Sequence, residues 1–132
     1  MADKWSQTAL LVIDMQNDFI LEDGLMKVNG GKAIVPNVIK AVDIARQRGI
    51  PCCLGCPAFF ATHLHSFLRT EGIKSLVITG VQTPNCIRQT VFDAVALDYQ
   101  PVTVIVDATA AATPDIHAGS TKGRNKGKRE TL

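Results

Sequence analysis

Short apolar runs alternate along the chain with longer segments in which apolar residues recur at helical spacing. The runs predict buried strands over residues 8–15, 50–54, 74–81 and 101–111. The helical spacing predicts helices over residues 33–49, 58–72 and 85–98. The apolar faces expected to be buried include Phe67 in the second helix and Val95 in the third. Strands that alternate with helices indicate an α/β fold, in which a parallel sheet carries helices on both of its faces.

The length and composition bound the class of protein. A chain of 132 residues can form one domain with one core. Hydrophobic residues make up 46% and charged residues 20%, a balance typical of a globular protein. No apolar run approaches the roughly 18 residues that a membrane span needs. Residues 1–16 carry no cleavage-site pattern of a signal peptide, so we expect a cytoplasmic protein whose cysteines stay reduced.

The basic character of the chain is concentrated in residues 119–132, GSTKGRNKGKRETL. This segment holds five basic groups and one acid, while the whole chain has a net charge of only +2. Residues 1–118, the predicted domain, are therefore mildly acidic. The Gly and Lys content without apolar periodicity predicts a disordered tail after that domain. We interpret it as a solvated tail rather than as a nucleic-acid-binding one.

Reactive side chains follow two of the predicted strands. Asp14 closes the first apolar run. After the run 74–81, Thr83 is a natural helix cap and Pro84 a natural first helical residue, which places Cys86 in the first turn. The amides of a first turn favour a thiolate and can bind an oxyanion. Because parallel strands end at one edge of a sheet, we expect the carboxylate and the thiol to lie close together, as base and nucleophile.

Structural roles are the alternatives for this pair: a turn-capping aspartate and a small buried cysteine. A carboxylate beside a thiolate also repels it, since two neighbouring anions disfavour each other. A working site of this kind therefore needs a cation, a lysine or arginine that follows another strand.

Three further cysteines, Cys52, Cys53 and Cys56, lie within GIPCCLGCPAFFATH, residues 49–63. The C-x-x-C spacing of Cys53 and Cys56 before a helix is the local context of a redox pair, and with His63 and His65 it contains the four ligands of a zinc set. A single C-x-x-C is a weak signal, and we expect His63 to be a packed core histidine. A thiol-redox or zinc-binding module, or a non-catalytic interaction protein, stays open as an alternative function.

The segments ALLVIDMQNDF and SLVITGVQTPNCIRQTVFDAVALDY resemble the isochorismatase-like cysteine hydrolases, which include nicotinamidases and ureidoacrylate amidohydrolases. The resemblance implies a three-layer Rossmann-like fold and an Asp–Lys–Cys triad acting on small amides. In that triad Cys86 attacks the amide carbonyl to form a thioester, and Asp14 is the base. It also implies a cis peptide between Val81 and Gln82 that shapes the oxyanion hole, and Phe19 in the substrate pocket.

The lysine of the triad has no counterpart here. The family carries it on a segment after its second strand, where this chain passes directly through residues 52–57 into the next helix. Lys27 and Lys32, expected in a loop, and Lys74, at the start of a strand, do not replace it. The Asp and two His residues that bind metal in many nicotinamidases are not matched either, so we expect no metal and no cofactor.

Loss of this segment has consequences for the sheet and for activity. The strand order of the family places the missing strands at the two sheet edges, which leaves four strands in the order 2-1-3-4. The exposed edges predict self-association into a homo-oligomer. Without the lysine, we expect the hydrolysis of a small-molecule amide to be absent or impaired.

Overall fold

The computed structural model describes residues 4–15, 20, 23–24, 28, 30–55 and 63–111. In these residues one parallel sheet has the order β2-β1-β3-β4. The strands are β1 (Thr8–Ile13), β2 (Cys52–Gly55), β3 (Ser75–Val81) and β4 (Val102–Ala110). The four-stranded parallel sheet and its order, which the family resemblance implied, are confirmed.

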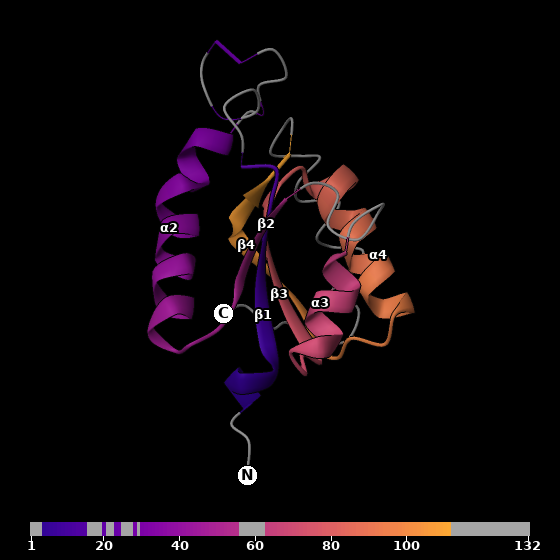
Figure 1. The fold of residues 1–132 in the computed structure, drawn as a ribbon. Coiled ribbons are helices and arrows are strands. Elements are labelled where there is room, and N and C mark those ends of the chain that lie inside the picture. Colours follow the sequence, from indigo (N-terminus) through magenta and orange to yellow (C-terminus); the bar gives the residue numbers. More distant parts are fainter. Residues whose placement is uncertain are drawn as a thin grey trace.

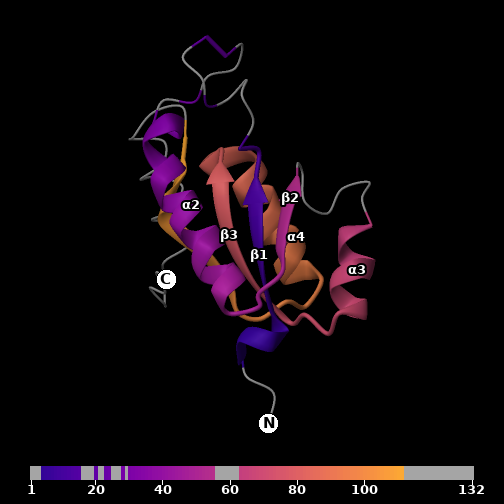
Figure 2. The same cartoon turned by 60° about the vertical axis from the view of Figure 1, so that its left-hand side comes forward.

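Helices cover the sheet on both faces. The described helical elements are η1 (Lys4–Gln7), α2 (Gly31–Gln47), α3 (Leu64–Thr70), η2 (Thr83–Ile87) and α4 (Arg88–Ala96). Helix α2 lies against one face of the sheet, while α3 and α4 lie against the other (Figures 1 and 2). The three-layer α/β arrangement is therefore confirmed.

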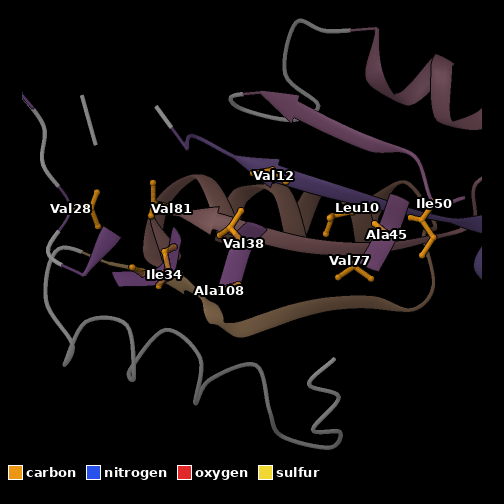
Figure 3. Packing of buried hydrophobic residues seen from close by; sticks show 11 residues of the cluster. Leu10, Val12, Val28, Ile34, Val38, Ala45, Ile50, Val77, Val81 and Ala108 are labelled. Atoms are coloured by element: carbon orange, nitrogen blue, oxygen red, sulfur yellow. The ribbon is translucent and has the colours of Figure 1, made fainter. Parts of the chain in front are cut away.

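Strand β1 supplies side chains to both layers of the core, and all six of its residues are buried. Successive side chains of a strand point to opposite faces. Leu11 and Ile13 pack in the cluster beneath α3 and α4, whereas Leu10 and Val12 pack in the cluster beneath α2. Figure 3 shows the second cluster, which runs along the length of the strands. An uninterrupted apolar run is what a strand buried on both faces requires.

Some expected boundaries and faces were wrong. Phe67 on α3 and Val95 on α4 were expected to be buried, but they are 47% and 59% exposed. Leu68 and Ala94, which belong to the same two predicted faces, are buried as expected. Adjacent residues of a helix point about 100° apart, so a short helix that buries one of them exposes the other. Of the helix predicted over 58–72, the described part is α3.

The basic tail, residues 119–132, lies outside the described residues. Among the residues that are described, no helix combines the length and the apolar character that a membrane span requires.

Candidate active site

Asp14 is the first residue after β1 and is only 3% exposed. Its backbone has a φ of +52°, in the left-handed region that non-glycine residues rarely adopt. Carboxylate atom Oδ1 is buried and has no hydrogen-bond partner among the described residues. A turn-capping aspartate would satisfy its oxygens, because a buried polar atom without a partner costs free energy. Asp14 is therefore a buried carboxylate at the carboxyl end of β1, where the sequence pattern predicted it.

Gly80 allows β1 and β3 to approach closely beside Asp14. The strands pair Ile13 with Gly80, so Asp14 and Val81 are the next residues along the same register. Gly80 has a φ of +113°, and a Cβ at this position would lie 2.7 Å from the backbone nitrogen of Ile13. Only glycine fits there. A glycine within a buried strand is a sequence signal for such close approach of two backbones.

The chain leaves β3 through a cis peptide between Val81 and Gln82, as the resemblance implied. Gln82 is extended and caps η2, and its carbonyl oxygen accepts hydrogen bonds from the N–H groups of Asn85 (3.2 Å) and Ile87 (3.1 Å). The cap was expected at Thr83, which is instead the first residue of the turn. The helix therefore begins one residue earlier than predicted, directly at the edge of the sheet.

Cys86 lies in η2, a π-helical turn that continues into α4. Its side chain is half-buried and packs against the core cluster that contains Ile13, the residue before Asp14. Its carbonyl oxygen accepts a 2.7 Å hydrogen bond from the Thr90 hydroxyl, which ties the turn to α4. Such π-turns are frequent at functional sites. The topology thus brings Asp14 and Cys86 to the carboxyl end of the sheet, as the strand pattern predicted, and Gln82, which the resemblance implied, lies there too.

The described lysines lie elsewhere. Lys32 was expected in a loop but lies in the first turn of α2, where it is exposed. Lys74 is exposed and comes directly before β3, at the opposite edge of the sheet. Within the described ranges, no buried lysine accompanies Asp14 and Cys86. Phe19, expected to line a substrate pocket, and Lys27 fall outside those ranges.

Cys52 and Cys53 lie on opposite faces of β2, where each packs against a different core cluster. Burial raises the pKa of the Cys53 thiol, and the neighbouring Cys52 raises it further. Burial also raises the pKa of Cys52, although Arg46 opposes this. A raised pKa lowers the thiolate population that redox chemistry requires. Cys52 and Cys53 thus resemble small apolar side chains of a strand, while the predicted redox pair of Cys53 with Cys56 stays a prediction, because Cys56 is not among the described residues.

The two histidines of the predicted zinc set lie in different surroundings. His63, expected to be packed in the core, is exposed just before α3. The Nδ1 atom of His65 lies 2.8 Å from the hydroxyl of Tyr99, and the two rings stack edge to face with centroids 5.7 Å apart. Among the described residues, no group of three His, Cys, Asp or Glu side chains could hold a metal ion. The sequence pattern did not signal the His65–Tyr99 pair.

A family model described as the isochorismatase domain matches residues 8–54 and 55–128. The break between the two matched parts falls within β2, one residue before its end. A relative from Arabidopsis thaliana, named as a probable inactive nicotinamidase, is 48% identical over 174 aligned residues, which cover 91% of this chain and 89% of the relative. The alignment is longer than the 132 residues of this chain, so the relative has residues without a counterpart here.

Solved structures share the fold. An isochorismatase family protein from Desulfovibrio vulgaris has a TM-score of 0.83 and 27% identity, over 89% of this chain and 88% of that chain. A nicotinamidase from Staphylococcus aureus has a TM-score of 0.80 and 22% identity, over 91% of this chain and 94% of that chain. These likenesses extend over nearly the whole chain.

Proposed function

The chain belongs to the isochorismatase family, and from this we propose that it is a nicotinamidase-like cysteine hydrolase in which hydrolysis of small amides is lost or strongly impaired. One observation carries the proposal. Asp14 and Cys86 share the carboxyl edge of the sheet, while the described lysines lie elsewhere. The name of the Arabidopsis thaliana relative, a probable inactive nicotinamidase, supports the same conclusion.

The proposed reaction is the two-step hydrolysis of a small-molecule amide. Asp14 takes the thiol proton as Cys86 Sγ attacks the amide carbonyl carbon, and the proton passes to the departing ammonia. The oxyanion forms beside the Cys86 amide and the backbone at Val81 and Gln82. Water then hydrolyses the thioester, which releases a carboxylic acid and restores the thiol. Phe19 lines the substrate pocket. The scheme needs no metal and no cofactor.

The absent lysine explains the proposed impairment. A thiolate next to the Asp14 carboxylate places two negative charges together, and a cation would offset that repulsion. The same cation would stabilise the charge that develops on the substrate oxygen. Loss of one such positioned group lowers a rate by roughly 100-fold or more.

We place the absent lysine-bearing segment near residues 52–57. The division of the family match within β2 and the greater length of the Arabidopsis thaliana alignment support this placement. Residues 1–118 then form the domain, and residues 119–132 form a solvated tail without a role in nucleic-acid binding. Cytoplasmic location fits a small-molecule hydrolase with reduced cysteines.

A shortened sheet leaves β2 at its edge, and we propose that the chain self-associates. Leu54 on β2 is 78% exposed. Strand β2 (Cys52–Gly55) carries no charged residue, the usual protection of an edge strand against pairing. Light scattering should show species larger than a monomer, and Leu54→Lys should shift the population to monomer. A monodisperse monomer at high concentration contradicts this part of the proposal.

The experiment that tests the function is an ammonia-release assay over nicotinamide, ureidoacrylate and simple amides. We expect the wild-type chain to release no more ammonia than Cys86→Ala. Cys52→Ala is the matched control, because it removes a half-buried thiol at the start of β2, which pairs with Leu10 rather than with the end of β1 that precedes Asp14. Turnover in the wild type and in Cys52→Ala that vanishes in Cys86→Ala would overturn the proposed impairment while keeping Cys86 as the nucleophile.

A further inference from the structure

A cavity of about 460 Å³ lies between α2 and the sheet. Its floor is built from Leu10, Ala45, Ile50 and Val77, all of them buried. Figure 3 shows these four side chains grouped at one end of the core cluster, with Val28, Ile34 and Val81 at the other end. Val81 belongs to the candidate active site. The cavity is therefore a separate feature, and its volume lies within the range of small-molecule sites, roughly 300–1,000 Å³.

The rim of the cavity is cationic. Lys40 and Ile44 are four residues apart on one side of α2, and Arg48, the residue that caps the end of this helix, follows four residues later. Lys40 and Arg48 are exposed, and one carboxylate, Asp107 of β4, stands against these two cations. The Arg48 guanidinium stacks over the ring of Trp5, 5.1 Å from its centroid.

A hydrogen bond between helix α2 and the sheet fixes the far side of the cavity. The Nδ2 atom of Asn37 on α2 donates a 2.8 Å hydrogen bond to the carbonyl oxygen of Asp107 on β4. This bond joins the helix to the last strand of the sheet, so the walls of the cavity are positioned by the fold itself. An apolar floor beneath two cations demands an occupant with an apolar body and an anionic end.

We propose that this cavity binds an amphipathic carboxylate, whose hydrocarbon chain covers the floor and whose carboxylate lies between Lys40 and Arg48. Charge complementarity selects the anion, since the rim carries one more cation than it carries acids. The apolar floor favours a ligand with a hydrocarbon chain. This activity is distinct from amide hydrolysis at the opposite end of the cluster, and it makes the chain a ligand-binding protein whether or not Cys86 reacts.

Trp5 is the single tryptophan of the chain and lines the cavity, so its fluorescence reports occupancy directly. The full-length protein is titrated with decanoate below its micelle concentration, and with decanol as the uncharged match. We expect a saturable change in Trp5 emission with decanoate and weaker binding of decanol. Lys40→Gln should weaken decanoate binding about two- to five-fold, the range of an exposed ion pair, and leave decanol unchanged.

Lys32→Gln is the matched control, because Lys32 is exposed on the same helix but does not line the cavity. It should bind decanoate like the wild type. A second variant, Ala41→Leu, fills part of the cavity and should weaken both ligands. Equal affinity for decanoate and decanol, or equal effects of the two lysine variants, would overturn the assignment of a carboxylate. If Trp5 emission responded to neither ligand, the proposed site would be overturned. This result would be obtained if another part of the chain filled the cavity.

Discussion

Strands β1 and β2 pair with each other in parallel but lie in different surroundings. Every residue of β1 is buried, whereas on β2 Cys52 and Cys53 are half-buried and Leu54 is 78% exposed. Strand β1 has a neighbour on each side, and β2 is at the edge of the described sheet. The central pair β1–β3 thus positions Asp14 and leads into the turn that carries Cys86, while the edge strand β2 is where we propose that the lysine-bearing segment is absent.

This difference separates two requirements of the proposed chemistry. Placing Asp14 beside the turn that carries Cys86 needs only the register of β1 on β3. In our proposal, the cation would come from a segment beyond β2 that this chain lacks. A chain can therefore keep the fold and the nucleophile and still lack the electrostatics of the reaction.

The largest expected effect on stability is in the central strand pair β1–β3. Gly80→Ala places a Cβ against the backbone of Ile13 at a φ of +113°. We expect a loss of roughly 3 to 5 kcal/mol in the free energy of unfolding, from backbone strain together with overpacking. Urea denaturation measures it. Gly72→Ala is the control, because its φ is +74° with no atom within 4 Å of the added Cβ, and it should cost about 1 kcal/mol. Equal losses would refute the close approach of the strands.

Truncating a leucine compares the two strands directly. Leu11→Ala on β1 removes a side chain that is 1% exposed and should cost about 3 kcal/mol in unfolding free energy. Leu54→Ala on β2, at 78% exposure in a single copy, should stay within about 0.5 kcal/mol at concentrations where the chain is monomeric. Both values come from chemical denaturation. Comparable costs for the two variants would show that another chain or segment covers Leu54 in solution.

A smaller effect concerns α3, the helix beside the edge strand. Tyr99→Phe removes the hydroxyl that lies 2.8 Å from His65 Nδ1 and keeps the aromatic ring. We expect a loss of about 1 kcal/mol, the net value of one hydrogen bond. Phe67→Ala on the same helix is the control, with a change near zero because Phe67 is 47% exposed. Thermal unfolding measures both variants. An unchanged melting temperature in Tyr99→Phe would show that the His65–Tyr99 hydrogen bond does not stabilise the fold.

The smallest effect is a pH dependence at the edge strand. Burial raises the pKa of Cys53 above its usual value of 9.0, so the folded chain holds that proton more tightly than the unfolded chain. The contribution to stability is complete below pH 9 and is lost as the pH rises through the folded pKa. Unfolding free energy should therefore fall above pH 9, and Cys53→Ala should reduce that fall. If the unfolding free energy of the variant fell with pH as steeply as that of the wild type, the fall would come from other groups. One such group is Tyr99, because burial also raises the pKa of its hydroxyl.

The sequence allowed much of the site to be predicted. Asp14 and Cys86 each follow a buried strand, and parallel strands end at one edge, so their common placement required no coordinates. The surroundings of the two histidines were harder to predict. His63 was expected in the core and is exposed, whereas His65 bonds Tyr99. Helical spacing tells which residues share a face but not which part of that face meets a neighbour.

The sequence by itself determined the order of strands and helices along the chain and the positions of Asp14 and Cys86 directly after buried strands, since these follow from local patterns. Tertiary structure alone decided that Cys52 and Cys53 pack in separate clusters and that a cationic-rimmed cavity opens beneath α2. The physical reason is distance along the chain. The cavity joins Leu10, Lys40, Val77 and Asp107, and only the packing of helix on sheet brings such remote residues together.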